Sequence, residues 1–227
     1  MILVLASAAD QAAGQFVQRG GGHAKLLTCR SLSAPGWRLS VPGRKPPIAV
    51  VEGERVSAAE IAGVIIRLPH VGEGELPDIA TADRSYVAAE MQAFLFAFLS
   101  ALRCPIVNRP TPVCLAGPNW RPAQWLKAAR EAGSAISAVS TVPDHGGAAG
   151  TRMAVSVIGN RCFGAADPQQ EEMACRLARA AGAQLLRVWF AGQDRAAAVL
   201  GADLWPDISD PQIGAAVLAL LATGVPA

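Results

Sequence analysis

The sequence predicts an α/β protein in which a parallel βαβ layer is followed by a smaller α+β lobe. Short apolar runs alternate with amphipathic helical patterns in the first part of the chain, which is typical of parallel strands joined by helices. Later, a Gly-Asn turn between two apolar runs, Ala154–Phe163, predicts a β-hairpin. A helix, another hairpin and a last helix are expected after it.

The composition argues against several classes of protein. The 227 residues are 52% hydrophobic and 17% charged, which excludes a disordered chain. A net charge of +2 without any run of Lys or Arg argues against a nucleic-acid partner. No apolar stretch reaches the roughly 18 residues that span a bilayer, and no signal peptide is expected. Five scattered cysteines indicate reduced thiols and a cytoplasmic protein.

The first βαβ unit is expected at the N-terminus. Ile2–Leu5 is a short apolar strand, Ser7 is predicted to cap a helix with Asp10 at its third position, and Ala24–Thr28 is the next strand. The turn after the first strand lacks the G-x-G-x-x-G fingerprint, so the pattern indicates a scaffold without a dinucleotide site.

A third parallel strand, Val64–Arg67, ends in a basic residue. Ligands of open α/β sheets bind outside the carboxyl ends of the strands, so Arg67 is predicted either as an anion ligand or as a structural ion-pair partner. Asp83 is expected to cap a long helix with one apolar face, and Pro122 is expected to open another helix that Gly133 ends.

The chain is predicted to divide into three parts. Residues 1–133 form the α/β domain, residues 134–150 a linker rich in Gly, Ser and Ala, and residues 151–227 the second lobe. In that lobe a helix should run from Asp167 to Gly182, followed by a strand at Gln184–Phe190 and a final helix that starts at Asp210.

The order of these motifs resembles the ATP-grasp ligases, in particular those related to graspetide maturases and glutamate ligases. Each motif is weak alone, and their order carries the resemblance. The motifs are a strand with Arg-x-Pro (Ile65–Pro69), a long helix with Tyr86 and Glu90, Val-Asn-x-Pro (Val107–Pro110), a Pro-x-Gln helix (Pro122–Gly133), an Arg-strand-Gly-x-Arg hairpin (Arg152–Arg161) and a segment ending in Pro-Asp (Val199–Asp207) in the place of the family's Leu-Glu-Val-Asn-Pro-x-Pro-Asp.

The resemblance implies a pre-ATP-grasp, Rossmann-like layer and a reduced ATP-grasp C-terminal lobe. The sequence departs from the family in two places. ATP-grasp enzymes carry a nucleotide lobe with a lysine and a Gly-rich flap between the Pro-x-Gln helix and the hairpin. Here residues 134–150 fill that interval and contain no lysine. The sequence is therefore interpreted as a truncated form.

The second departure concerns the residues that the resemblance implies as magnesium ligands. By the motif, the family's Glu is replaced by Gly201 and its Asn by Asp203, and the acidic residue of the preceding strand falls on Trp189 or Phe190. Asp203 and Asp207 are the predicted metal ligands that remain, with a solvated turn as the other interpretation. The resemblance also implies that Arg152 and Arg161 hold an anion, as Arg67 could.

Two functions follow from the resemblance. The first is a non-catalytic pseudoenzyme that binds an anionic small molecule or peptide, or serves as accessory subunit of a full-length ATP-grasp ligase, with a homodimer as the other expected assembly. Trp120, Trp125 and Trp205 are its candidate contact residues. The second is an ATP- and Mg-dependent carboxylate–amine ligase, either a minimal enzyme or one completed by a partner chain. A nucleophilic hydrolase is disfavoured because no Gly-x-Ser-x-Gly elbow is present.

Overall fold

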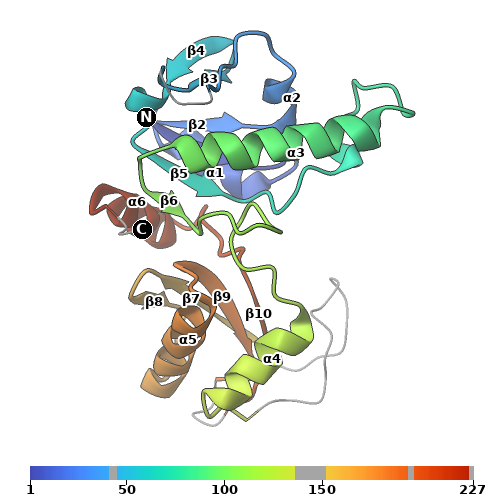
Figure 1. Ribbon diagram of the computed structural model, residues 1–227. Helices are drawn as coiled ribbons and strands as arrows, with labels where there is room; N and C mark the ends of the chain where they lie inside the picture. The colour runs from blue at the N-terminus through green and yellow to red at the C-terminus, as the bar shows by residue number, and fades with distance from the viewer. Residues whose placement is uncertain (41–44, 136–151, 194–196, 225–227) are drawn as a thin grey trace. The chain divides into compact units, whose positions relative to one another are not determined.

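The computed structural model describes residues 1–40, 45–135, 152–193 and 197–224, and the chain divides into two compact units (Figure 1). Unit 1 comprises residues 1–117 with 218–227, and unit 2 comprises residues 118–217. Most of the linker predicted at 134–150 lies outside the described residues.

Unit 1 is built on the predicted parallel sheet. Its strands are β1 (Ile2–Leu5), β2 (Ala24–Leu27), β5 (Gly63–Ile66) and β6 (Ile106–Val107), in the order β2-β1-β5-β6 with every neighbour parallel. The central strands are almost entirely buried, which explains why they read as unbroken apolar runs. The α/β class of the fold is confirmed.

The helices of unit 1 are α1 (Gln11–Arg19), the short α2 (Cys29–Leu32) and the long α3 (Arg84–Ala101). The apolar face of α3 is core as predicted, since Leu95, Phe98 and Leu99 are buried. Trp37 packs edge-on against Phe98, with ring centroids 5.2 Å apart. The described part of unit 1 also contains two short 3-10 helices, Ala58–Glu60 and Glu73–Glu75, and the separate hairpin β3 (Ile48–Val51) and β4 (Glu54–Ser57).

The predicted cap of the first helix was wrong by three residues. Helix α1 begins after Asp10, whose Oδ1 accepts a hydrogen bond from the Ala13 amide at 3.0 Å. Ser7 instead accepts from the amide of Ala9, and the Asp10 amide donates to the Ser7 carbonyl. The chain thus makes a turn over residues 7–10 before the helix starts, and Asp10 is the N-cap.

Unit 2 contains the predicted hairpin within an antiparallel sheet. The strands β7 (Met153–Ile158), β8 (Arg161–Phe163), β9 (Leu185–Phe190) and β10 (Val199–Asp203) lie in the order β10-β9-β7-β8. Helix α5 (Pro168–Ala181) contacts β7, β8 and β9, and α4 (Pro122–Glu131) contacts β10 (Figure 1). The last helix, α6 (Pro211–Ala222), is divided between the two units. Its residues up to Val217 belong to unit 2, and those from Leu218 on belong to unit 1.

The two ends of α5 explain why its boundaries could be predicted from the sequence. The Asp167 side chain accepts from the Gln169 amide at 2.7 Å, and Pro168 occupies the first turn, where its missing N–H costs nothing. At the other end Gly182 adopts φ +62°, the left-handed conformation that closes many helices. Both predicted boundaries of α5 are confirmed.

Candidate functional site

One face of the unit 2 sheet carries a row of polar side chains. The strand register aligns Ser156 of β7 with Arg187 of β9, and Arg187 with Asp203 of β10. Residues directly opposite one another on antiparallel strands point to the same face. Phe163 of β8 pairs with Ser156, so an aromatic side chain lies on the same face at the other edge of the sheet.

Asp203 is held by donors on both of its carboxylate oxygens. Arg187 Nε donates to both oxygens at 3.1 Å, and Arg187 Nη2 donates to Oδ2 at 3.0 Å. The indole Nε1 of Trp189 donates to Oδ2 and the backbone amide of Trp205 donates to Oδ1, each at 2.8 Å. The side chain of Asp203 is 17% exposed and that of Arg187 27% exposed, so the pair is screened from much of the solvent.

Trp189 also fixes the guanidinium of Arg187. The Cζ atom of Arg187 lies 4.6 Å from the centroid of the Trp189 ring, within the range of a cation–π contact. One aromatic residue therefore stacks on the cation and donates a hydrogen bond to its counterion. The planar guanidinium is suited to such a site because it pairs with a carboxylate and stacks at the same time.

This arrangement does not fit Asp203 as a magnesium ligand. Mg²⁺ requires oxygen lone pairs in octahedral geometry. The lone pairs of Asp203 already accept from a guanidinium, an indole and an amide. Among the described residues there is also no group of three or more His, Cys, Asp or Glu side chains that could hold a metal ion.

Asp207, the other predicted metal ligand, lies on the turn before α6 and is exposed. Its Oδ1 accepts from the amide of Ser209 at 3.0 Å and from the Ser209 hydroxyl at 2.5 Å. These contacts are those of a side chain that stabilises its own turn. The metal role of Asp207 stays a prediction.

Arg161 lies on the same face of the sheet as Arg187. It pairs with Ile158, two positions from Ser156 along β7, and its side chain is exposed. Its Cζ atom is 5.1 Å from the centroid of the Phe163 ring, which holds the guanidinium over an aromatic surface. Arg152 immediately precedes β7 and is half-buried. The anion-binding role of both arginines stays a prediction.

Arg67, in unit 1, makes an ion pair with Asp10. Its Nε donates to Asp10 Oδ2 at 2.6 Å, and its side chain is only 7% exposed. Since Asp10 also caps α1, this contact joins the end of β5 to the start of the first helix. The structural partner foreseen as one alternative for Arg67 is thus present, and its role as an anion ligand stays a prediction.

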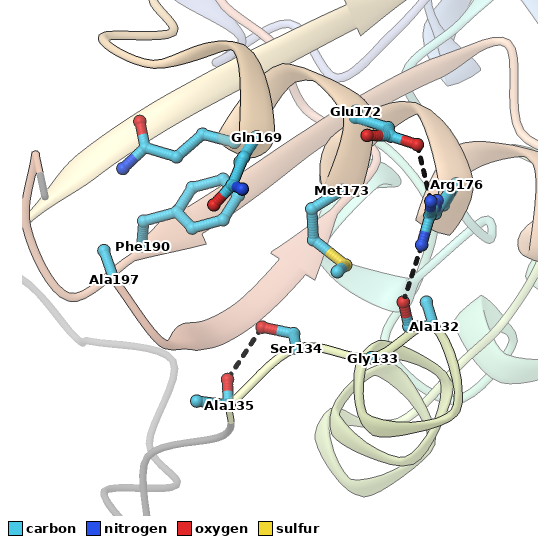
Figure 2. A pocket seen from close by; sticks show the side chains of 11 residues that line it. Ala132, Gly133, Ser134, Ala135, Gln169, Glu172, Met173, Arg176, Phe190 and Ala197 are labelled. Carbon is cyan, nitrogen blue, oxygen red and sulfur yellow. Dashed lines mark hydrogen bonds and ion pairs between the residues drawn. The ribbon is translucent and has the colours of Figure 1, made fainter. Parts of the chain in front are cut away.

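A cavity of about 420 Å³ lies in unit 2 beside α5 (Figure 2). Met173 and Phe190 line it, together with backbone that follows α4. Arg176, on its rim, donates to Glu172 Oε1 at 2.5 Å and to the Ala132 carbonyl at 3.3 Å. The volume is within the range of small-molecule pockets. Because Phe190 and Trp189 are consecutive in β9, this cavity lies on the opposite face of the sheet from the Arg187–Asp203 pair.

Neither a protein-family model nor a curated protein sequence matches the chain. Solved structures do match it. Macrocyclase MdnC from Microcystis aeruginosa MRC, bound with precursor peptide MdnA, aligns with a TM-score of 0.67 at 12% identity, over 97% of this chain and 98% of that chain. ATP-grasp ligase PsnB, complexed with a minimal precursor, Mg and ADP, aligns with a TM-score of 0.64 at 15% identity, over 96% and 97%.

This chain has the ATP-grasp fold. A third ATP-grasp structure agrees, the RiPP-associated ligase of Chryseobacterium gregarium in complex with ADP and a leader and core peptide, with a TM-score of 0.64 at 11% identity over 99% of this chain and 97% of that chain. The resemblance stated from the motif order is thereby confirmed at the level of the fold. None of the described helices of this ATP-grasp-fold chain is long and apolar enough to cross a bilayer.

Arg187 is the residue of the ATP-grasp-fold sheet that the sequence analysis missed. A charged residue within the apolar strand Leu185–Phe190 was the available signal, since an arginine in a half-buried strand needs a partner. Its partner, Asp203, follows only from the register of β9 and β10. Of the expected contact residues, Trp125 is buried and packs against Trp120 with centroids 4.7 Å apart.

Proposed function

We propose that this ATP-grasp-fold protein is a non-catalytic binding protein, which serves as an accessory subunit of a full-length ATP-grasp ligase and holds an acidic peptide. The contact that carries the proposal is the Arg187–Asp203 pair. Where the resemblance implies an oxygen ligand for magnesium, Asp203 already has a guanidinium as its cation. A protein that keeps the fold but neutralises this carboxylate internally is suited to binding and poorly suited to phosphoryl transfer.

The neighbouring positions support the same proposal. Gly201, where the resemblance implies a glutamate, pairs with Trp189, one of the two positions, with Phe190, at which it implies an acidic residue on the preceding strand. Between the end of α4 and the start of β7 the chain has only residues 132–152, and none of residues 134–150 is a lysine. We infer that this interval replaces the nucleotide lobe of the enzymes.

An acidic peptide is the ligand that the remaining cations favour. Arg161 is exposed on the sheet face, over the ring of Phe163, and Arg152 lies just before β7. An aromatic ring beside an arginine suits a peptide carboxylate with an apolar neighbour. MdnC was solved with a precursor peptide, PsnB with a minimal precursor, and the Chryseobacterium ligase with a leader and core peptide. We extend this peptide binding to the present chain, without their nucleotide.

The proposal is tested with a fluorescently labelled peptide rich in Glu, compared with its Gln counterpart. Anisotropy should show saturable binding of the Glu peptide that weakens about tenfold in Arg161→Gln, as expected for loss of one charge-assisted contact. Arg179→Gln, an exposed arginine at the end of α5, is the matched control and should bind as wild type does. Equal affinity for both peptides would reject an anionic ligand.

A second candidate is an ATP-dependent carboxylate–amine ligase whose active site is completed by a partner chain. The observation in its favour is that PsnB and the Chryseobacterium ligase, with the same fold, hold ADP. This candidate requires binding of Mg-ATP to the complex of the two chains, whereas the accessory subunit adds no nucleotide site to the ligase. The number of nucleotides bound per complex, compared with the number bound by the full-length ligase alone, distinguishes the two candidates.

A further inference from the structure

Strand β8 and helix α5 bring two thiols together. The Sγ atoms of Cys162 and Cys175 are 3.0 Å apart. A disulfide bond is about 2.05 Å long, so the two sulfurs need to approach by only about 1 Å to form one. The other three cysteines of the sequence, Cys29, Cys104 and Cys114, all belong to unit 1, so Cys162 and Cys175 are the two thiols of unit 2.

The surroundings of the pair allow oxidation. Both side chains are half-buried, and α5 covers the sheet from the face to which Cys162 points. Cys162 Sγ also donates to the carbonyl oxygen of Glu171 at 3.7 Å. Burial, with the neighbouring thiol of Cys175 as the next cause, raises the pKa of the Cys162 thiol. Cys162 therefore keeps its proton at neutral pH and its hydrogen bond to Glu171, so we assign the first attack on an oxidant to the sulfur of Cys175.

We propose that Cys162 and Cys175 are a modification site, a dithiol that peroxide oxidises reversibly to a disulfide joining β8 to α5. In the first step the sulfur of Cys175 attacks one oxygen of hydrogen peroxide, which gives a sulfenic acid, and the thiol proton of Cys175 goes to the leaving hydroxide to make water. In the second step the sulfur of Cys162 attacks the sulfur of Cys175. The leaving hydroxide takes the Cys162 proton as a second water, so two thiols and one peroxide yield one disulfide and two waters.

The disulfide would tie an edge strand to the helix that contacts it. Strand β8 has three residues and lies at the edge of its sheet, where β7 is its neighbour among the strands that the structure describes. A bond from its middle residue to the middle of α5 closes the loop of residues 162–175. Closing a loop of this size lowers the entropy of the unfolded chain, so oxidation stabilises unit 2.

The test uses the full chain, treated with hydrogen peroxide, quenched, and alkylated under denaturing conditions. Wild type should show two fewer alkylated cysteines, a mass lower by two hydrogen atoms before alkylation, and a peptide map linking Cys162 to Cys175. Dithiothreitol should reverse all three. The oxidised protein should melt at least about 5 °C higher than the reduced protein.

Three variants make the result specific. Cys175→Ser and Cys162→Ser should each abolish the loss of two thiols and the shift in melting temperature. Cys104→Ser, which removes a half-buried cysteine of unit 1, should leave both intact. The proposal is overturned if folded wild type yields no Cys162–Cys175 link, or if Cys175→Ser still loses two thiols under the same treatment. The wild-type peptide map decides the matter even if a serine variant fails to fold.

Discussion

The guanidinium of Arg187 and the carboxylate of Asp203 face each other across adjacent strands, with Nη2 3.0 Å from Oδ2 and Nε 3.1 Å from both oxygens. The two residues are a directly opposed pair in the register of β9 and β10. Opposite charges in this position stabilise the sheet, and here they also satisfy the carboxylate that the resemblance assigns to a metal.

A double-mutant cycle measures the coupling free energy between Arg187 and Asp203. Arg187→Gln and Asp203→Asn should each lower the free energy of unfolding by about 1–2 kcal/mol, because each leaves a partly buried charge without its partner. The double variant should lose about 1 kcal/mol less than the sum, since no unpaired charge remains. Urea denaturation gives these values. Arg161→Gln, at an exposed site, should stay within about 0.5 kcal/mol of wild type, and strict additivity would show that the pair contributes no coupling.

Asp10 should be the most sensitive polar residue of the first βαβ unit. Asp10→Ala removes both the cap on the Ala13 amide and the ion pair with Arg67, and should cost about 2–3 kcal/mol of unfolding free energy. Asp10→Asn retains an oxygen for the cap and should cost about 1 kcal/mol less. Thermal or urea unfolding of the two variants compares them. If both lose equal stability, the cap contributes nothing.

Gly164 and Gly182 form a matched pair of glycines with positive φ. At Gly164, with φ +82°, an added Cβ would lie 2.7 Å from the carbonyl oxygen of Ala154, whereas at Gly182, with φ +62°, the space is open. Gly182→Ala should cost about 1 kcal/mol through the backbone alone. Gly164→Ala should cost about 3 kcal/mol or more, since backbone must also move. Melting temperatures in the reverse order would contradict this account of the turn after β8.

Cys29 should make the protein sensitive to alkaline pH. Burial, aided by the charge of Glu75, raises the pKa of its thiol to about 12 in the folded protein. The unfolded chain releases this proton near the ordinary thiol pKa of about 8.5, so unfolding becomes coupled to deprotonation. Stability is therefore full below about pH 8.5 and falls as the pH rises toward 12. Cys29→Ala should show a shallower loss of unfolding free energy between pH 8.5 and 10.5, and an unchanged slope would exclude Cys29 as the cause.

The sequence predicted the fold well where local signals were strong. The Gly-Asn turn of the β7–β8 hairpin, the cap and the terminal glycine of α5, and the buried parallel strands were all found from short patterns. Such patterns work because turn and cap geometry depends on a few consecutive residues. The start of α1 shows the limit, since Ser7 and Asp10 both had the chemistry of a cap, and only the turn over residues 7–10 selected Asp10.

The site was harder to predict because its contacts join residues far apart in the sequence. Asp203 was found as a candidate, but its partner Arg187 depends on a strand register that no local pattern sets. The pair of Arg67 with Asp10 likewise crosses from one strand end to another helix start. Charged residues within half-buried strands are the sequence signal that could have pointed to such pairs.

Because Arg187 neutralises Asp203, we propose that the protein does not bind nucleotide with magnesium. Calorimetric titration of Mg-ATP into the full chain tests it most directly, with Arg187→Gln titrated in parallel to expose the Asp203 carboxylate. Wild type should give no saturable heat up to millimolar Mg-ATP. Saturable binding by wild type with a dissociation constant in the micromolar range, lost in Asp203→Asn, would contradict it.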